Sequence, residues 1–346
     1  MNKKYIFVVC MLSTLLFTAC KNGDWEFDNF KNSAVYFAYQ SPIRTITLGE
    51  ENPNVTDNTL DNLHQCQIVA TISGVYDNSN DVVIDFHVEN GIVNGFKFKD
   101  GGDIVAMPST HYTLSNNKQI VIPSGSILGG VTVQLTDAYF ADPLSTQLTY
   151  VIPVVMDHVT GADSILVGKA QDGVTNPSYL KADDWSVLPK NYVLYAIKYI
   201  SPYQANFLRR GVENFSGAKT GSVIRHQPNV EKDELLNKQF STLAVNTVEW
   251  NRPTQDADGK DVDCRLKLSF DADGKCVITS NSQGVTASGS GQFVPDGDKK
   301  SWGDEDRDVL YLDYTLDYAG IKSVTKDTLV VRDRGVKPEW FTVEAK

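Results

Sequence analysis

The stretch MPSTHYTLSNNKQIVIPSGSILGGVTVQL, residues 107–135, decides the fold class, because apolar and polar residues alternate along it. A period of two predicts half-buried β-strands, and the polar SNNK segment predicts a turn that reverses the chain. The residues expected on buried faces are Tyr112, Leu114, Ile120, Ile122, Val131, Val133 and Leu135. The stretch therefore predicts strands with one face in a core and the other in solvent.

The same pattern extends outward on both sides of this stretch. Short apolar runs are separated by Gly, Asn, Asp and Pro, and they include SAVYFAYQ (33–40), QIVATISGVY (67–76), DVVIDFHVE (81–89) and LTYVIPVVM (148–156). Several short strands with turn residues between them are typical of two packed sheets. Residues 31–170 are therefore predicted to form an all-β sandwich domain.

A second β-rich domain is expected after a break in the pattern. Residues 171–190 show little periodicity and include Pro177 and Pro189, so they are predicted to be a linker. From NYVLYAIKYIS onward, residues 191–346 contain a series of strands joined mostly as hairpins, and a single short helix is expected near EKDELLNK (231–238). Such a series predicts a closed or nearly closed antiparallel, lipocalin-like β-barrel, because closure removes exposed strand edges.

The first residues have the features of an export signal. Lys3 and Lys4 precede an apolar run that ends at Phe17, and small Thr18 and Ala19 stand before Cys20. Residues 1–19 are therefore interpreted as a cleaved signal peptide and residues 20–30 as a tether. The alternative is an ordinary secretory signal followed by a chance cysteine.

The cleavage region resembles a bacterial lipobox, although Phe17 stands where that motif usually has Leu, Val or Ile. The resemblance implies that Cys20 is acylated and becomes the mature N-terminus. Several acyl chains would anchor the protein stably, at about 0.8 kcal/mol per buried methylene. The expected location is the outer membrane, with the chain held at the cell surface by its lipid.

Charge and cysteine content exclude several classes of function. The formal net charge is −11, and it becomes −13 once Lys3 and Lys4 are removed with the signal. Such a chain repels phosphate backbones, so nucleic acid is not expected as a partner. The cysteines beyond the lipobox form no zinc-type spacing, and they are interpreted as packing residues: Cys66, Cys264 and Cys276.

Both halves resemble modules of Bacteroidota surface lipoproteins. The segment 107–135 together with YVIPVVM (150–156) is similar to an immunoglobulin-like N-terminal domain of unknown function, which also precedes some endo-glycosidase domains. The segments YAIKYISPYQANFLRRG, SWGDEDRDVLYLDYTLDY and DTLVVRDRGVKPEWF resemble a C-terminal β-barrel domain of unknown function, over about residues 191–344. The resemblance implies association with glycan-utilisation systems and carries over no catalytic residues.

Signals for catalysis or a metal cofactor are absent from the sequence. The five histidines are scattered, with no H-E-x-x-H and no G-x-S-x-G motif. A TIM barrel needs about 250 residues of alternating strand and helix, whereas residues 191–346 are fewer and strand-rich. The repeated DADGK at 256–260 and 271–275 is foremost a turn, with calcium binding as the alternative. We therefore expect neither an enzyme nor a cofactor.

Aromatic residues in polar segments are the candidate ligand-binding residues, because sugar C–H faces stack on flat rings. They are Trp185, Tyr203, Trp250 and Trp302. Packing is the alternative role for each ring, since Trp is highly buried on average. As a group they favour a non-catalytic, glycan-binding surface lipoprotein, and an outer-membrane transporter complex is a candidate partner.

Two other classes of function remain open. A lipocalin-like carrier would hold a small apolar ligand inside the barrel, and it would need an open apolar cavity. A structural component of an outer-membrane complex would instead expose a large apolar patch. A glycan-binding protein differs from both, because it needs aromatic rings on an outer face.

Overall fold

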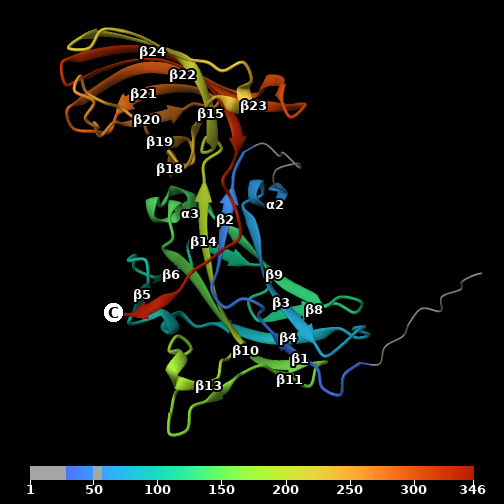
Figure 1. The fold of residues 1–346 in the computed structure, drawn as a ribbon. Helices are drawn as coiled ribbons and strands as arrows, with labels where there is room; N and C mark the ends of the chain where they lie inside the picture. Colours follow the sequence, from blue (N-terminus) through green and yellow to red (C-terminus); the bar gives the residue numbers. More distant parts are fainter. Residues whose placement is uncertain (1–28, 50–56) are drawn as a thin grey trace, which may run out of the picture.

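The computed structural model describes residues 29–49 and 57–346, and it is built almost entirely of strands. Figure 1 shows two bodies, a sandwich and a strongly curled sheet, joined by a narrow waist. The predicted signal peptide, Cys20 and the predicted tether up to residue 28 lie outside the described residues. Among the residues that are described, no helix has the length and apolar character needed to cross a membrane.

Two sheets form the sandwich. The first sheet has five strands in the order β11 (Ser164–Ile165), β1 (Ala34–Tyr36), β3 (Gln65–Ser73), β9 (Leu128–Leu135) and β7 (Tyr112–Leu114). The second sheet runs in the order β25 (Glu339–Trp340), β2 (Pro42–Thr47), β14 (Tyr192–Ile200), β10 (Tyr150–Thr160), β4 (Val82–Val88) and β8 (Gln119–Ile122), and β6 (Val105–Ala106) also pairs with β10.

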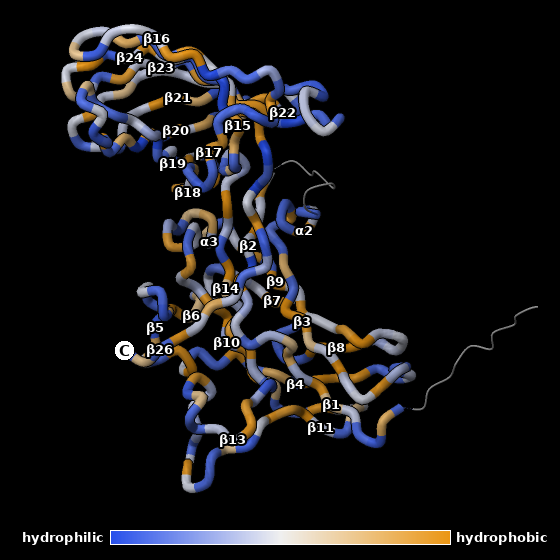
Figure 2. The backbone as a smooth tube through the Cα atoms, in the orientation of Figure 1, coloured by the Kyte–Doolittle hydropathy of each residue, from blue (hydrophilic) through white to orange (hydrophobic). Residues whose placement is uncertain are grey.

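Alternation along the strands determines which side chains enter the sandwich core. Val131, Val133 and Leu135 are at most 2% exposed and face the second sheet, as the sequence pattern predicted. The central strand β10 is buried on both faces, and its run of consecutive apolar residues follows from that. Figure 2 shows these apolar segments converging on the middle of the sandwich.

The SNNK turn connects strands that belong to different sheets, which the sequence pattern did not indicate. Strand β7 pairs with β9 in the first sheet, whereas β8 pairs with β4 in the second sheet. The segment between them therefore carries the chain from one sheet to the other and does not close a hairpin. Period-two alternation predicts which face of each strand is buried. It does not predict which sheet the strand joins, because both sheets bury that face in the same core.

Short elements complete the first body. They are the small pairs β12 (Lys169–Ala170) with β13 (Trp185–Val187) and β5 (Phe96–Phe98) with β26 (Val343–Ala345), the helices α2 (Thr59–Asn62) and α3 (Asp137–Ala141), and the 3-10 turns η2 (Asn90–Val93), η3 (Pro143–Thr146) and η4 (Ala182–Asp184). The segment predicted as a linker thus contains η4 and a strand pair.

The second body is a single ten-stranded antiparallel sheet, called here the curled sheet. Its order is β16 (Gly221–Arg225), β15 (Asn206–Gly217), β24 (Ile321–Asp333), β23 (Glu305–Tyr318), β22 (Val285–Trp302), β21 (Lys275–Ser280), β20 (Arg265–Phe270), β19 (Thr247–Asn251) and β18 (Phe240–Ala244), and β17 (Glu234–Leu236) also pairs with β15. Within residues 57–346, no ladder joins β18 back to β15, β16 or β17. The β-rich prediction is confirmed, and full closure into a lipocalin-like barrel is not.

The sandwich takes more of the chain than residues 31–170. Strand β14, predicted to open the second domain, pairs with β10 and β2 in the second sheet. Residues 336–346 also return to the sandwich, because β25 pairs with β2 and β26 with β5. An apolar run such as YVLYAIKYI identifies a buried strand, but it does not say which sheet receives that strand.

Arg334 joins the two bodies at the waist. Its Nε donates to the carbonyl of Gln204 (2.8 Å), and its Nη2 donates to the carbonyls of Leu48 (3.1 Å) and Ser201 (2.7 Å). The Leu48 and Ser201 carbonyls directly follow β2 and β14, and Gln204 lies in the connection to β15, so one guanidinium satisfies backbone groups of both connections.

One local prediction was wrong. The expected helix at 231–238 is a 3-10 turn, η5 (Val230–Lys232), followed by strand β17. Pairing of Glu234 with Arg209 of β15 overrides the helix propensity of this segment.

Candidate functional site

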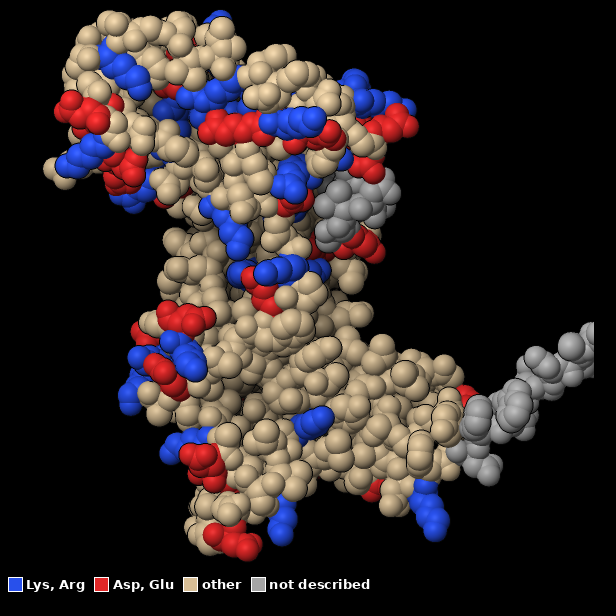
Figure 3. All heavy atoms as spheres, viewed as in Figure 1, with Lys and Arg blue, Asp and Glu red and all other residues tan. Residues whose placement is uncertain are grey.

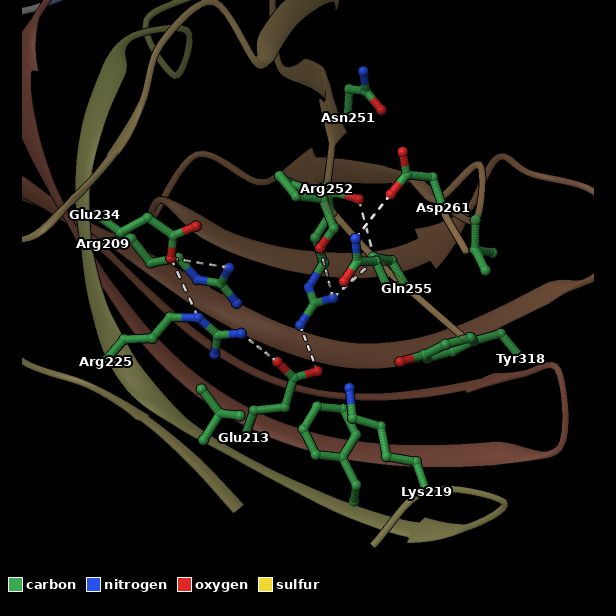
Figure 4. A pocket seen from close by; sticks show the side chains of 15 residues that line it. Arg209, Glu213, Lys219, Arg225, Glu234, Asn251, Arg252, Gln255, Asp261 and Tyr318 are labelled. Atoms are coloured by element: carbon green, nitrogen blue, oxygen red, sulfur yellow. Dashed lines mark hydrogen bonds and ion pairs between the residues drawn. The ribbon is translucent and has the colours of Figure 1, made fainter. Parts of the chain in front are cut away.

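A pocket with a volume of about 600 Å³ lies against the concave face of the curled sheet (Figure 4). Side chains at alternate positions of β15 point into it, because i and i+2 residues of a strand share a face. Polar and charged residues dominate the lining, which consists of Arg209, Glu213, Phe215, Lys219, Val223, Arg225, Glu234, Asn251, Arg252, Pro253, Thr254, Gln255, Asp261, Val262 and Tyr318.

Glu213 is the most strongly bound carboxylate of the pocket. It accepts hydrogen bonds from Arg252 (2.6 Å), Arg225 (2.7 Å) and the hydroxyl of Ser323 (2.5 Å). Burial acts to raise the pKa of Glu213, but Arg252, Ser323 and Arg225 outweigh it and lower that pKa to about 2. Glu213 is therefore ionised at neutral pH and is held in one orientation.

A second buried carboxylate, Asp327, lies on the neighbouring strand β24. Its Oδ2 accepts from Arg209 Nη2 and from the hydroxyl of Tyr314, both at 2.8 Å. The Tyr314 hydroxyl accepts in turn from Arg252 Nε at 2.8 Å. Gly211 stands opposite Asp327 in the ladder, and a Cβ there would collide with the Lys326 carbonyl and the Asp327 carboxylate. The missing side chain leaves the room that Asp327 occupies.

Glu234 completes a continuous ring of polar side chains. Its Oε2 lies 3.2 Å from Arg225 Nε and 3.5 Å from Arg209 Nη1. The ring consists of Arg209, Asp327, Tyr314, Arg252, Glu213, Arg225 and Glu234, each in contact with the next and the last with the first. Three guanidinium groups balance three carboxylates, so this polar ring is neutral overall and rigidly cross-linked.

The rest of the pocket lining adds hydrogen-bonding groups and small apolar faces. In Figure 4, Lys219 and Asn251 approach the pocket from opposite sides, and Tyr318 lies beside it. Gln255 donates to Asp261 at 3.1 Å, and the Lys219 ammonium lies 4.5 Å from the centre of the Phe215 ring. Donors, acceptors and apolar faces thus surround one small space, as in sites for polar small molecules.

The carboxylate at the centre of the polar ring is held by its neighbours. Glu213 is fully engaged, and a carboxylate with a pKa of about 2 is a weak base at neutral pH. No cluster of three or more His, Cys, Asp or Glu side chains suitable for a metal ion occurs in the described part of the chain. Asp256 and Asp271, the first residues of the two DADGK segments, instead accept backbone N–H groups of their own turns.

The structure places the four candidate aromatic residues in three separate environments. Trp250 is fully buried, stacks on Phe240 at 5.3 Å and lies 5.3 Å beneath the Arg209 guanidinium. Tyr203 belongs to the same core and stacks on Phe270 at 3.7 Å. Both rings therefore pack inside the curled sheet, and Trp250 supports the pocket from behind through Arg209.

The other two candidates lie elsewhere and are partly buried. Trp185, in the segment predicted as a linker, donates from Nε1 to the Ser178 carbonyl at 2.8 Å. Trp302 packs on the small cluster around Leu208 and Val309, with the Arg307 guanidinium 3.9 Å above its ring. The four residues do not share one binding face.

Sequence reasoning missed the charged residues of the pocket. The signal was present in NFLRRGVENF, where Arg209 and Glu213 share a face with buried Phe207. Charges at core-facing positions of a strand indicate a paired, buried network. The cysteine prediction is confirmed for the residues described, because Cys66, Cys264 and Cys276 are buried and unpaired.

Two family models match parts of the chain, one in each body. Residues 202–335 match the Domain of unknown function (DUF5627), and residues 28–163 match a family described as a "-like, N-terminal domain". No curated protein matches the chain.

Solved structures give one strong likeness. A Bacteroides ovatus protein of unknown function has 44% sequence identity and a TM-score of 0.84, covering 92% of this chain and 100% of its own. Another Bacteroides ovatus protein of unknown function has 14% identity and a TM-score of 0.40, covering 90% and 100%. An auxiliary nutrient binding protein from Bacteroides thetaiotaomicron has 12% identity and a TM-score of 0.34, covering 80% and 88%. The last two likenesses are too low to bear on the function of this chain.

Proposed function

This chain belongs to the family of the 44% identical Bacteroides ovatus protein of unknown function, and we propose that it is a non-catalytic, glycan-binding surface lipoprotein. One observation carries the proposal. A pocket of about 600 Å³ on the curled sheet is lined by oriented hydrogen-bonding groups interspersed with apolar faces. Sugars combine many hydroxyls with apolar C–H faces, so this mixture matches their chemistry better than that of an apolar ligand.

Binding without catalysis is supported by the state of the carboxylates. Glycosidases generally need one carboxylic acid that can give up a proton and a second carboxylate placed about 5–9.5 Å away. Glu213 and Asp327 are instead tied to arginines, and Glu234 lies within 3.5 Å of two of them. Groups held in this way orient a ligand but do not exchange protons with it.

A lipocalin-like carrier of apolar ligands receives less support. The interior of the curled sheet is filled by its own side chains, among them Trp250, Phe207 and Leu310, which are completely buried. The described pocket on this sheet has charged groups along its wall. An apolar ligand would have to desolvate those groups without pairing them, which is costly.

Attachment and location form part of the same proposal. Acylated Cys20 holds the chain at the outer membrane, the sandwich spaces the curled sheet from the lipid, and the pocket is presented to glycans outside the cell. In Figure 3, acidic and basic side chains are interspersed over the visible face of the upper body, so this face has no single sign of charge. A role beside a glycan transporter is consistent with such a presentation.

Calorimetric titration of the lipid-free chain, from Lys21 onward, tests the function. The titrants are soluble oligosaccharides of glucose, xylose, mannose, N-acetylglucosamine and galacturonic acid. We expect saturable binding that weakens about tenfold in Lys219→Ala or Asn251→Ala, the scale of one lost hydrogen bond to a ligand. Lys267→Ala, a change at an exposed lysine on β20, is the matched control and should bind normally.

Two results would contradict the proposal. One is the absence of binding to every oligosaccharide, whether or not an apolar molecule co-purifies with the protein. The other is hydrolysis of a bound oligosaccharide, detected as new reducing ends.

A further inference from the structure

Two aromatic rings that are not among the candidate residues discussed above lie exposed on the outside of the sandwich. Tyr39 is 59% exposed and Trp340 is 55% exposed, and their ring centres are 5.5 Å apart. Tryptophan is a residue type that is highly buried on average, so an exposed one beside a second exposed ring is unusual. Neither ring belongs to the described apolar cores.

The fold holds Trp340 firmly in this exposed position. Trp340 lies on β25, where it pairs with Pro42 of β2, and the next backbone N–H donates to Ser41 at 3.1 Å. Phe341 points the other way and is buried against Phe98, with ring centres 5.1 Å apart. Because Phe341 anchors the segment, Trp340 is already held in its exposed position before a ligand binds. A ligand then need not order this side chain, which favours affinity.

A groove of about 430 Å³ runs beside the Trp340 ring. Its polar lining includes the ion pair of Lys198 and Glu339 (2.9 Å) together with Asp100 and Lys337. No ion pair engages Asp100 or Lys337 within the described residues, so these groups can bond to a ligand. The volume lies in the range of small-molecule sites, about 300–1,000 Å³.

We propose that Trp340, Tyr39 and this groove form a second saccharide-binding site, separate from the pocket of the curled sheet. One face of a pyranose ring stacks on the Trp340 indole, and its hydroxyls bond to Asp100, Lys337 and the Lys198–Glu339 pair. Only the class of ligand rests on the proposed function, because the two sites share no lining residue.

The charged lining favours a sugar over the other partners that an exposed aromatic ring could bind, namely a protein or a membrane. A specific protein partner needs an interface of about 1,000 Å² or more with an apolar centre, whereas Lys198, Lys337, Glu339 and Asp100 interrupt the apolar surface here. A membrane would have to desolvate the two carboxylates. A sugar can use the ring and the charges together.

The test is oligosaccharide titration of the lipid-free chain carrying Trp340→Ala, Trp340→Phe or Tyr39→Ala. Trp340→Ala should weaken binding of at least one oligosaccharide tenfold or more, as loss of a central tryptophan does at binding sites. Trp340→Phe keeps an aromatic face and should retain more of the affinity. Phe30→Ala is the matched control, because Phe30 is 66% exposed and also lies 5.6 Å from a tyrosine ring, that of Tyr76.

The variants of the two sites separate the two proposals. If Trp340→Ala weakens binding and Lys219→Ala does not, the second site stands and the curled-sheet pocket falls. If Trp340→Ala, folded by its thermal unfolding curve, binds as the unaltered chain does while Lys219→Ala binds weakly, the second site is overturned. If Trp340→Ala does not fold, Tyr39→Ala and Trp340→Phe decide in the same way. Absence of all oligosaccharide binding overturns both.

Discussion

Arg252 and Glu213 face each other inside the curled sheet with 2.6 Å between Nη2 and Oε1, and both side chains are only 2% exposed. An isolated buried pair often gains little over apolar residues, because both charges lose their hydration. Here each partner has further polar contacts, Arg252 with Tyr314 and Glu213 with Arg225 and Ser323. The pair therefore belongs to a network. Removing one of its members costs more stability than burying the complete network does.

Changing Glu213 alone should destabilise the curled sheet strongly. Glu213→Gln removes one negative charge and leaves Arg252 and Arg225 without their shared partner. We expect a loss of about 3–5 kcal/mol in the free energy of unfolding, measured by urea denaturation. Asp313→Asn is the control, since Asp313 is 58% exposed in its pair with Lys326 and should change stability little. Equal effects of the two changes would contradict the role of the network.

The lowered pKa of Glu213 predicts a specific dependence of stability on pH. The pKa is about 2 in the folded chain and 4.5 without these partners, so the unfolded state binds the proton more readily. The stabilisation is fully present above pH 4.5 and is lost as the pH falls through 2. Its full size is about 3 kcal/mol, of which about 2 kcal/mol should be gone by pH 3.

Urea denaturation at pH 6 and pH 3 measures this loss. Glu213→Gln cannot titrate at this position, so its stability should fall less between the two pH values. A variant that loses as much stability as the unaltered chain would show that other carboxylates cause the effect.

Gly211 should not tolerate a side chain. In Gly211→Ala the new Cβ would meet the Lys326 carbonyl and the Asp327 carboxylate, so β15 and β24 must separate. We expect a loss of about 1–3 kcal/mol. Gly102→Ala is the control, because the nearest atom to its Cβ would lie at 3.6 Å, an ordinary contact. Thermal unfolding should therefore shift downward in the first variant and hardly at all in the second.

Arg334 should determine how firmly the two bodies are joined. Arg334→Ala leaves the carbonyls of Leu48, Ser201 and Gln204 without this donor. We expect faster proteolytic cleavage in the connections 201–205 and 334–338, read by mass spectrometry of the fragments. Arg332→Ala, at a residue whose side chain is 44% exposed, is the control and should be cleaved as slowly as the unaltered chain. Identical cleavage of the two variants would rule out this role of Arg334.

The sequence predicted the fold class because alternation is a local property. Val131 and Val133 show the pattern, and both are buried as expected. The sheet that a strand joins is a non-local property, which is why the placements of β8 and β14 were missed. Closure of the curled sheet is also a non-local property, because it depends on whether β18 pairs with β15. No local sequence pattern predicts that pairing.

The candidate site was harder to predict than the fold. The polar sequence context suggested that Trp250 was exposed. In the structure Asn251 and Arg252 line a pocket, whereas the Trp250 ring is buried in the core. Trp340 stands next to Phe341, and sequence alone does not say which of the two rings faces solvent. The polar ring joins residues up to 118 positions apart, such as Arg209 and Asp327, so only the folded chain reveals it.

The return of residues 336–346 to the sandwich has a consequence for biosynthesis. Strands β25 and β26 are made after the entire curled sheet, yet Phe341 completes an apolar cluster on the second sheet of the sandwich. The DUF5627 region is in effect an insertion within the first domain. During vectorial synthesis, the first domain to begin is therefore the last to finish, and a truncation in its final eleven residues would damage the domain that lies earliest in the chain.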